Sequence, residues 1–224
     1  MAKRLAPAAL AAASVLLTIA SWRHWVPLDL TETLGFVTGA WCVWLTVKEN
    51  VLNWPIGIAN AAFYVVVFLR ARLFADMSLQ VLYVILGFLG WYWWMKGGEK
   101  KTVLRVSTTP VAEWAWLLPT AALATWGMTL YLRSIADAAP FLDALTTVMS
   151  LVAQYLLTKK YVENWFIWIS ADVIYIGLYA WKGLPLTSAL YAIFLCMCVV
   201  GLKEWKKSLI TPRKLTVEAY AEAL

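Results

Sequence analysis

The sequence is poor in charged residues. Only 14% of its 224 residues are Asp, Glu, Lys or Arg, whereas a soluble domain typically has about 25%. Apolar residues make up 62% of the chain, and the mean hydropathy is +0.70. This composition excludes an ordinary water-soluble globule and indicates a protein that lies in a membrane.

Chemically reactive residues are also scarce. His24 is the only histidine, and no spacing of His, Cys and Glu suits a metal site. No Gly-x-x-x-x-Gly-Lys-Ser/Thr loop is present, which argues against ATP-driven transport. Because Cys42, Cys196 and Cys198 all lie in apolar segments, we expect them to pack as small apolar residues rather than form disulfides. These absences argue against an enzyme and predict neither a metal nor a cofactor.

Long apolar runs recur between short charged loops. In lipid, helices satisfy their own backbone groups, whereas open sheets do not, and the alternating pattern of barrel strands is absent. We therefore predict an all-α polytopic membrane protein with eight apolar helices, at 8–22, 33–47, 54–70, 77–95, 112–132, 141–158, 164–181 and 184–202. The first follows a basic start and also fits a cleaved signal or a signal anchor. An uncleaved extra N-terminal helix is the prediction.

Basic residues flank these segments unevenly. Counted on alternating sides, 14 Lys and Arg residues fall on the side of both termini and five on the other side. The positive-inside rule then predicts a cytoplasmic C-terminus in a bacterial inner membrane. Because the net charge of +6 arises from these flanking residues, no nucleic-acid partner is predicted.

The chain contains an internal repeat. An offset of 111 residues aligns 48–58 with 159–169, and both runs contain an Asn-Trp pair. Further matched pairs are Tyr64 with Tyr175, Leu73 with Leu184, Leu79 with Leu190, and Lys96 with Lys207. Each copy holds three helices, so the odd helix at 112–132 gives both copies the same orientation in the membrane. Parallel repeats with a site near the midplane occur in transporters.

The repeat divides the chain into five parts. They are an N-terminal hydrophobic segment (1–29), a first three-helix repeat (30–97), a linking helix with its loops (98–138), a second three-helix repeat (139–207) and a cytoplasmic tail (208–224). The predicted fold is therefore two parallel three-helix repeats joined by a linking helix, a 3+1+3 arrangement, with an extra N-terminal helix.

The second helix of the second copy has a polar and aromatic face. At about 100° per residue, five side chains fall within about 80° of its circumference: Trp165, Trp168, Asp172, Tyr175 and Tyr179. A carboxylate near mid-bilayer is costly in lipid, so Asp172 is expected to face the bundle interior or a wet cavity. We predict that Trp165, Trp168, Asp172 and Tyr175 contact a substrate.

Other helices add polar groups to the predicted site. In the first copy, Tyr64 matches Tyr175, and Asn60 lies beside the corresponding face. On the third helix of each copy, Gln80 and Tyr191 occupy matching positions. Asn60, Tyr64, Gln80 and Tyr191 complete the predicted substrate contacts.

These assignments have structural alternatives. Asn60 and Gln80 equally fit interhelical hydrogen bonds, and Asp172 fits an interhelical bond or proton coupling. Tryptophans near helix ends are typical of the interfacial aromatic belt. This alternative is the expectation for Trp91, Trp93, Trp94, Trp114, Trp116 and Trp205.

The predicted site favours a particular ligand chemistry. Aromatic faces, amides and one carboxylate without Lys or Arg suit a flat ring with hydroxyls that is neutral or cationic. Cation–π attraction and the carboxylate would both favour a positive ring. A phosphorylated ligand is poorly suited to such a site.

Two motifs resemble a known family. The run Lys159 to Trp165, with Trp168 after it, and the Gly-Trp-Tyr-x-Trp run at Gly90 to Trp94 resemble the PnuC family of vitamin transporters, over about residues 30–207. The resemblance implies a SWEET-like fold and uptake of nicotinamide riboside by facilitated diffusion. It also implies a cytoplasmic kinase that traps the substrate.

The resemblance also bears on single residues. It implies ring contacts at Trp165 and Trp168, and hydroxyl or amide contacts at Asn60 and Gln80. Asp172 departs from the pattern, because some nicotinamide riboside carriers have Asn there. Since thiamine is also a cation and related members carry thiamine or riboflavin, the vitamin stays open.

A non-transporting membrane scaffold is the main rival function. Parallel repeats can equally build a helix-packing platform, which predicts no solute-dependent change in stability. In the preferred interpretation the partners are a small vitamin and membrane lipid, and assembly into a homo-oligomer stays open.

Overall fold

The computed structural model describes residues 2–26, 30–70, 72, 74–181, 183 and 185–210. Leu73, Lys182, Leu184 and the predicted tail from 211 onward, with Arg213 and Lys214, lie outside the described residues. The described chain forms eight α-helices and one short 3-10 helix: α1 (Ala2–Trp22), α2 (Leu30–Val47), α3 (Asn53–Arg70), α4 (Phe74–Lys96), η1 (Glu99–Lys101), α5 (Val111–Ser134), α6 (Pro140–Thr158), α7 (Asn164–Trp181) and α8 (Pro185–Ile210).

Each of the eight predicted apolar segments is a helix. The largest difference is at α8, which continues past the predicted end at residue 202 to Ile210. The continuation is charged on one side, but Trp205 and Leu209 pack into the core, so burial extends the helix beyond the apolar run. The predicted start of the tail, residue 208, therefore lies inside α8.

Four helices are long and apolar enough to cross a membrane by length and composition. They are Leu30–Val47, Met77–Lys96, Pro140–Thr158 and Thr187–Ile210, and Pro7–Trp22 is a shorter apolar helix. The helices α3, α5 and α7 carry Trp, Asn, Thr or Asp residues, which lower their hydropathy. The all-helical, membrane-type fold is confirmed.

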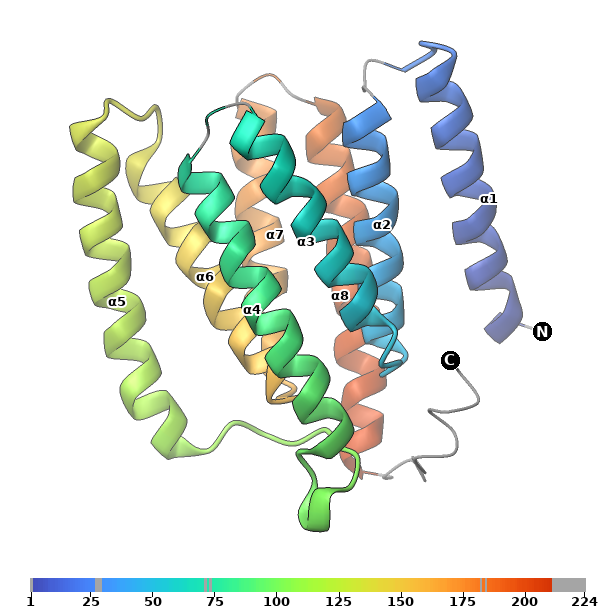
Figure 1. Ribbon diagram of the computed structural model, residues 1–224, viewed down its shortest axis with the longest axis vertical. Coiled ribbons are helices and arrows are strands. Elements are labelled where there is room, and N and C mark those ends of the chain that lie inside the picture. The colour runs from blue at the N-terminus through green and yellow to red at the C-terminus, as the bar shows by residue number, and fades with distance from the viewer. Residues whose placement is uncertain are drawn as a thin grey trace.

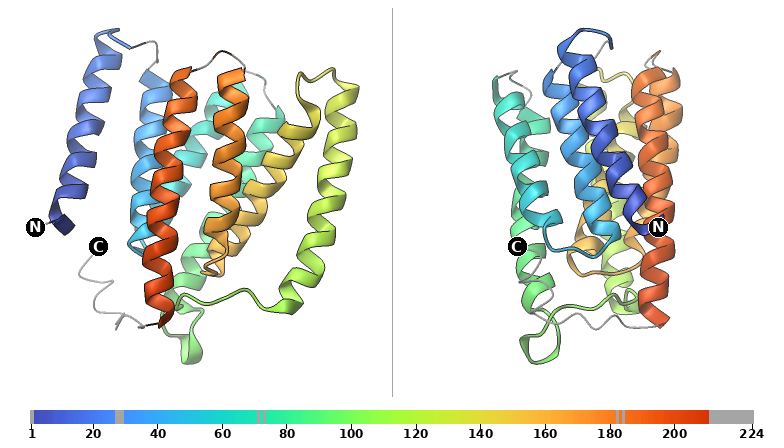
Figure 2. Two further views of the ribbon diagram at one scale, coloured as in Figure 1. Left: turned by 180° about the vertical axis from the view of Figure 1, so that it is seen from behind. Right: turned by 90° about the vertical axis from the view of Figure 1, so that its right-hand side faces the viewer.

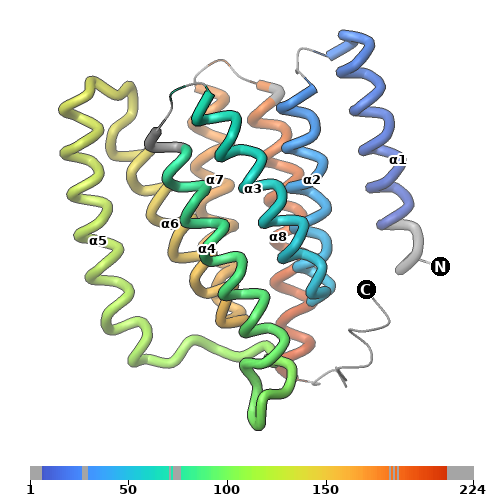
Figure 3. The backbone as a smooth tube through the Cα atoms, in the orientation of Figure 1, coloured from blue at the N-terminus to red at the C-terminus, as the bar shows by residue number. Residues whose placement is uncertain are grey.

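The helices lie side by side and alternate in direction, with α1 and α5 at the two outer edges (Figures 1 and 2). The α2–α3 turn (48–52), the α4–α5 loop (97–110), the α6–α7 turn (159–163) and the end of α8 lie at one end of the molecule (Figure 3). We call this the turn end.

Four buried tryptophans pack at the turn end. Trp54 meets Trp94 at 5.4 Å between ring centroids and 87° between ring planes. Trp165 meets Trp205 at 5.4 Å and 88°. Trp94 and Trp205 then meet each other at 5.8 Å. We call these residues the four-tryptophan cluster.

The interfacial-belt prediction is wrong for Trp94 and Trp205, because both are fully buried. Trp94 Nε1 donates to the carbonyl of Leu157 at 3.0 Å, and Trp205 Nε1 donates to the carbonyl of Thr46, also at 3.0 Å. Helix α4 is thereby tied to α6, and α8 to α2. A tryptophan near a helix end can lie in the interfacial belt or in the protein core. Which of the two it occupies depends on whether neighbouring helices cover it.

The helices α2 and α6 end in the same way. Glu49 and Lys160 both have positive φ, 56° and 58°. One residue later, the Asn50 amide donates to Leu45 O and the Tyr161 amide donates to Leu156 O, each at 2.9 Å. This is the hydrogen-bond pattern of a Schellman C-cap, here without glycine.

Candidate functional site

A cavity of about 230 Å³ lies between α2, α6, α7 and α8. It is lined by Gly39, Cys42, Val43, Thr46, Gln154, Leu157, Asn164, Trp165, Trp168, Asp172, Tyr191, Phe194 and Cys198. No Lys, Arg or His is among these described lining residues. A concave, largely apolar space with a few convergent polar groups is the usual form of a small-molecule site.

The predicted face of α7 lines this cavity. Trp165 and Asp172 are buried, with 2% and 5% of their surfaces exposed, and Trp168 packs against the buried core. Asn164, at the first position of α7, donates through Nδ2 to Tyr161 O at 2.6 Å. The α6–α7 turn thereby fixes the start of α7, and the helical period then directs Trp165, Trp168 and Asp172 to one side.

Asp172 is the one acidic side chain among the described lining residues of the cavity. Cys198 Sγ lies 3.4 Å from Asp172 Oδ2, so α8 offers the carboxyl group a weak thiol donor. In the described lining no basic side chain faces Asp172. A cation in the cavity would therefore be attracted, and a phosphate would be repelled.

Two buried polar atoms beside the cavity lack a protein hydrogen-bond partner. They are Asn164 Oδ1 and Trp165 Nε1, an acceptor and a donor. Leaving such a group unpaired costs about 1–3 kcal/mol, so a ligand with hydroxyl or amide groups is a physical reason for their retention. Asn53 Oδ1 and Trp54 Nε1 are also unpaired, but neither residue lines the cavity.

Stacked rings border the cavity away from the turn end. Tyr191, a lining residue, lies 4.7 Å from Tyr175 and 5.3 Å from Tyr179 between ring centroids. Phe194 contacts Tyr191 at 6.1 Å and Phe36 of α2 at 5.2 Å. Tyr175 therefore packs against the lining residue Tyr191 and does not itself line the cavity.

The first-copy residues lie elsewhere. Asn60 Nδ2 donates to Gly35 O at 3.1 Å and to Thr38 Oγ1, which joins α3 to α2 as interhelical bonds. Tyr64 stacks on Phe68, and neither Tyr64 nor Gln80 of α4 is in the described cavity lining. Asn60, Tyr64 and Gln80 do not line this cavity, and their contacts with a substrate stay predictions.

The sequence interpretation missed the contribution of α2. Gly39, Cys42 and Thr46 line the cavity, together with Cys198 of α8. Their spacing of three and four residues was a signal, because small and weakly polar residues on one face of an apolar helix mark a close approach. The cysteines are free, as expected, yet Cys42 and Cys198 form part of the site.

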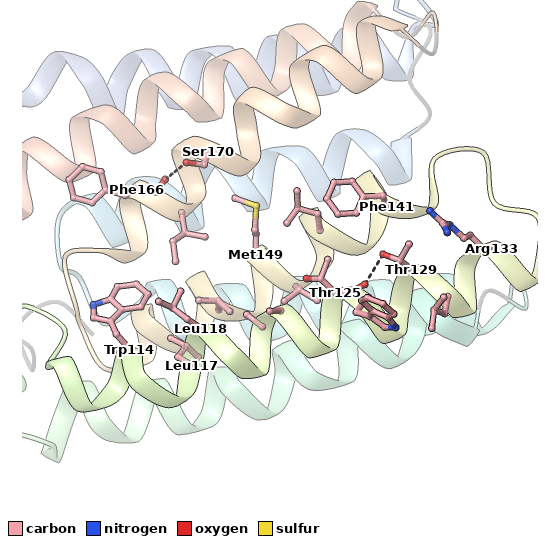
Figure 4. A pocket seen from close by; sticks show the side chains of 18 residues that line it. Trp114, Leu117, Leu118, Thr125, Thr129, Arg133, Phe141, Met149, Phe166 and Ser170 are labelled. Carbon is pink, nitrogen blue, oxygen red and sulfur yellow. Dashed lines mark hydrogen bonds between the residues drawn. The ribbon is translucent and has the colours of Figure 1, made fainter.

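A larger hollow, of about 750 Å³, lies between α5, α6 and α7 (Figure 4). Its lining is almost wholly apolar and runs from Trp114 to Arg133 (Figure 4). The hydroxyls of Thr129 and Ser170 donate to carbonyls of their own helices. Because lining residues such as Trp126 are 68% exposed, this is an outer apolar groove, and the smaller cavity is the candidate site.

Comparison with known proteins identifies the family. Residues 29–207 match the model of the family described as nicotinamide mononucleotide transporter. The chain belongs to this family. The match begins just before α2 and ends within α8, so it includes every helix that lines the candidate site.

Named relatives cover most of the chain. The nicotinamide riboside transporter PnuC of Neisseria mucosa is 33% identical over 195 residues, covering 81% of this chain and 73% of the relative. PnuC of Escherichia coli is 26% identical over 207 residues, covering 81% and 87%. A crystal structure of the vitamin B3 transporter PnuC superposes with a TM-score of 0.65 at 28% identity, covering 88% of this chain and 90% of that one.

Proposed function

We propose that this membrane transporter carries nicotinamide riboside by facilitated diffusion, with the riboside bound in the cavity between α2, α6, α7 and α8. The relatives named as nicotinamide riboside transporters support this substrate. The nicotinamide ring of the riboside is a flat cation, which suits the Trp165 and Trp168 rings and the Asp172 carboxylate. Its sugar hydroxyls suit the unpaired Asn164 Oδ1 and Trp165 Nε1.

We favour the riboside over the mononucleotide as the substrate because the described cavity lining contains no basic residue. A phosphate is normally bound by Arg, Lys or a helix N-terminus. The first amides of α7, from Asn164 to Ile167, already donate to carbonyls of the α6–α7 turn. Here a phosphate would meet Asp172 in a buried, largely apolar space. Thiamine is the second candidate, because it is also a cation. Riboflavin is third, because its neutral three-ring system is large for about 230 Å³.

We also propose that the architecture is two parallel three-helix repeats, α2–α4 and α6–α8, joined by α5. In support, α3 and α7 have bounds 111 residues apart at both ends. The pairs Trp54–Trp94 and Trp165–Trp205 share this offset, as do the carbonyl partners Thr46 and Leu157. The units 1–29, 30–97, 98–138, 139–207 and 208–224 follow from this arrangement.

The predicted orientation gives transport a direction. The turn end carries Lys48, Lys96, Lys159 and Lys160, which supports a cytoplasmic turn end and C-terminus in the bacterial inner membrane. We propose that α1 is retained as an extra helix and that a cytoplasmic kinase traps the released riboside. The proposed partners also include membrane lipid, and assembly into a homo-oligomer stays open.

The aromatic contact is testable by truncation. We expect Trp168→Ala to weaken riboside binding by about 1–2 kcal/mol, the size of a desolvated cation–π contact. The variant should still fold, because Trp168 is only partly buried. Calorimetric titration of the purified variant measures this. Wild-type affinity would return Trp168 to a packing role.

A ligand screen tests the substrate proposal. A ligand that binds only the folded state raises the melting temperature. We expect a rise with nicotinamide riboside and none with nicotinamide mononucleotide at the same concentration. A rise with thiamine or riboflavin alone would reassign the vitamin, and no rise with any of these solutes would favour a scaffold.

A further inference from the structure

The turn end holds an ion pair between matching positions of the two proposed repeats. Glu49 follows α2 and Lys160 follows α6, each in a left-handed backbone conformation. Their side chains meet with Lys160 Nζ 3.0 Å from Glu49 Oε2, and only 0% and 3% of the Lys160 and Glu49 side chains is exposed. This conformation belongs to the matching C-caps of the two helices, which place Glu49 and Lys160 at equivalent positions.

The pair is the centre of a network that joins four segments. Lys160 Nζ also donates to Leu104 O at 3.0 Å and lies 4.6 Å from the centroid of the Trp94 ring. Ser208 Oγ, near the end of α8, donates to Glu49 Oε1 at 2.5 Å. The α2–α3 turn, the α6–α7 turn, the α4–α5 loop and the end of α8 are therefore joined through these two side chains.

The α4–α5 loop is fixed against the α6–α7 turn by further bonds. The Ser107 amide donates to Lys160 O at 3.2 Å, and the Val162 amide donates to Ser107 O at 2.9 Å. Glu163 Oε2 accepts from both the amide and the hydroxyl of Thr109, at 2.9 and 2.7 Å. The loop thus closes over the ion pair and separates it from solvent.

The ion pair and the cavity are adjacent along two helices. Thr46 and Leu157 line the cavity, and each lies three residues before its member of the pair. Their carbonyls accept from Trp205 and Trp94; Trp94 also lies against Lys160, and Trp205 against the cavity residue Trp165. On the side away from the turn end, α2 and α8 are in contact through the Phe36 and Phe194 rings.

A buried ion pair suits a gate better than a permanent staple. Its Coulomb attraction and its hydrogen bonds to Leu104 and Ser208 favour the closed arrangement, and the hydration that both charges regain on separating offsets most, but not all, of the loss on opening. Removing one partner alone leaves a buried unpaired charge and is strongly unfavourable. The pair therefore specifies one closed arrangement and still permits an open one.

We propose that the Glu49–Lys160 pair is the latch of a gate that closes the turn end of the transport path. The Trp94 and Trp205 hydrogen bonds form the layer between the latch and the cavity. When the latch opens, α2 and α6 separate at their ends, and the cavity becomes accessible from the turn end. This proposal rests on the proposed transport function and adds the residues that control release.

Native thiols report on this gate. Cys42 and Cys198 line the cavity, whereas Cys196 is exposed, so Cys196→Ser gives a background with cavity thiols only. A charged, membrane-impermeant methanethiosulfonate is added to everted vesicles, whose outer face is the turn end in the proposed orientation. Mass spectrometry then measures the modification rate of Cys42. No substrate is needed, so failure of the riboside assignment does not affect this readout.

We expect the neutral double variant Glu49→Gln/Lys160→Met to raise the Cys42 modification rate at least tenfold in everted vesicles. The charge exchange Glu49→Lys/Lys160→Glu restores an opposite pair at matching positions and should give a slower rate than the neutral variant. The matched control is Glu204→Gln/Lys207→Gln, which removes an ion pair of α8 whose lysine is 73% exposed. Its rate should equal that of the background.

Two results would overturn the latch. One is an unchanged Cys42 rate in a folded neutral variant, because the cavity would then remain closed without the pair. The other is failure of the neutral variant to fold. A gate that opens must leave the rest of the protein folded when the pair is separated, so the fold cannot depend on the pair. In either case the pair is a structural staple.

Discussion

Asp172→Asn should weaken binding of nicotinamide riboside by roughly 1–3 kcal/mol, the range of charge-assisted interactions, which is about 5- to 150-fold in Kd. The amide preserves the shape of the side chain and removes its charge. Asp172 is the only charged residue in the described cavity lining, so little else there would replace the lost attraction. Calorimetric titration of the purified protein gives both affinities.

A neutral analogue separates charge from shape. Benzamide riboside replaces the cationic ring by a neutral ring of similar size, and its affinity should fall much less in Asp172→Asn. Equal losses for both ligands together with a lower melting temperature would indicate a structural Asp172. Binding that is nearly intact, with the pH dependence of uptake abolished, would indicate proton coupling instead. Either pattern would contradict the counter-ion role.

Gly201→Leu should abolish most substrate binding, because Gly201 makes room for a cavity residue. A Cβ atom there would lie 2.5 Å from the Trp165 ring, and the space beside this ring is the cavity that it lines. Overpacking of this kind costs typically about 1–3 kcal/mol, more than the gain of about 1 kcal/mol in helix propensity. Trp165 must therefore shift, and with it the cavity wall.

The repeat supplies the matched control. In Gly90→Leu the added Cβ would lie 2.1 Å from the Trp54 ring, but Trp54 is not in the cavity lining. Both variants should have lower melting temperatures, and only Gly201→Leu should lose more than about tenfold in affinity. Gly127→Leu, with open space around its Cβ, should resemble wild type in both measurements. Equal affinity losses at Gly90 and Gly201 would remove Trp165 from the site.

The sequence predicted the helices and one face of the site for a local reason. Apolar length and the helical period are properties of single segments, so Trp165, Trp168 and Asp172 were placed on one face without knowledge of their neighbours. The structure brings all three to the same cavity. Tyr191 was also found, because its position on α8 follows from the repeat.

Non-local packing limited the remaining predictions. Asn60 and Gln80 were chosen from helix faces of the first copy and from the family resemblance, whereas the cavity is lined by α2 rather than α3 or α4. The belt prediction for Trp94 and Trp205 failed because Gly90 and Gly201, on other turns of the same helices, create the space in which the four-tryptophan cluster packs. Such contacts depend on which helices meet, which the period of one helix does not specify.

Transport by purified protein in liposomes tests the central claim most directly. Liposomes loaded with buffer alone are placed in labelled nicotinamide riboside or labelled nicotinamide mononucleotide, with and without proton and sodium gradients. The account predicts that riboside enters until the inside and outside concentrations are equal, that gradients do not change this level, and that the mononucleotide does not enter. Accumulation of riboside above the outside concentration, or uptake of the mononucleotide at a similar rate, would contradict it.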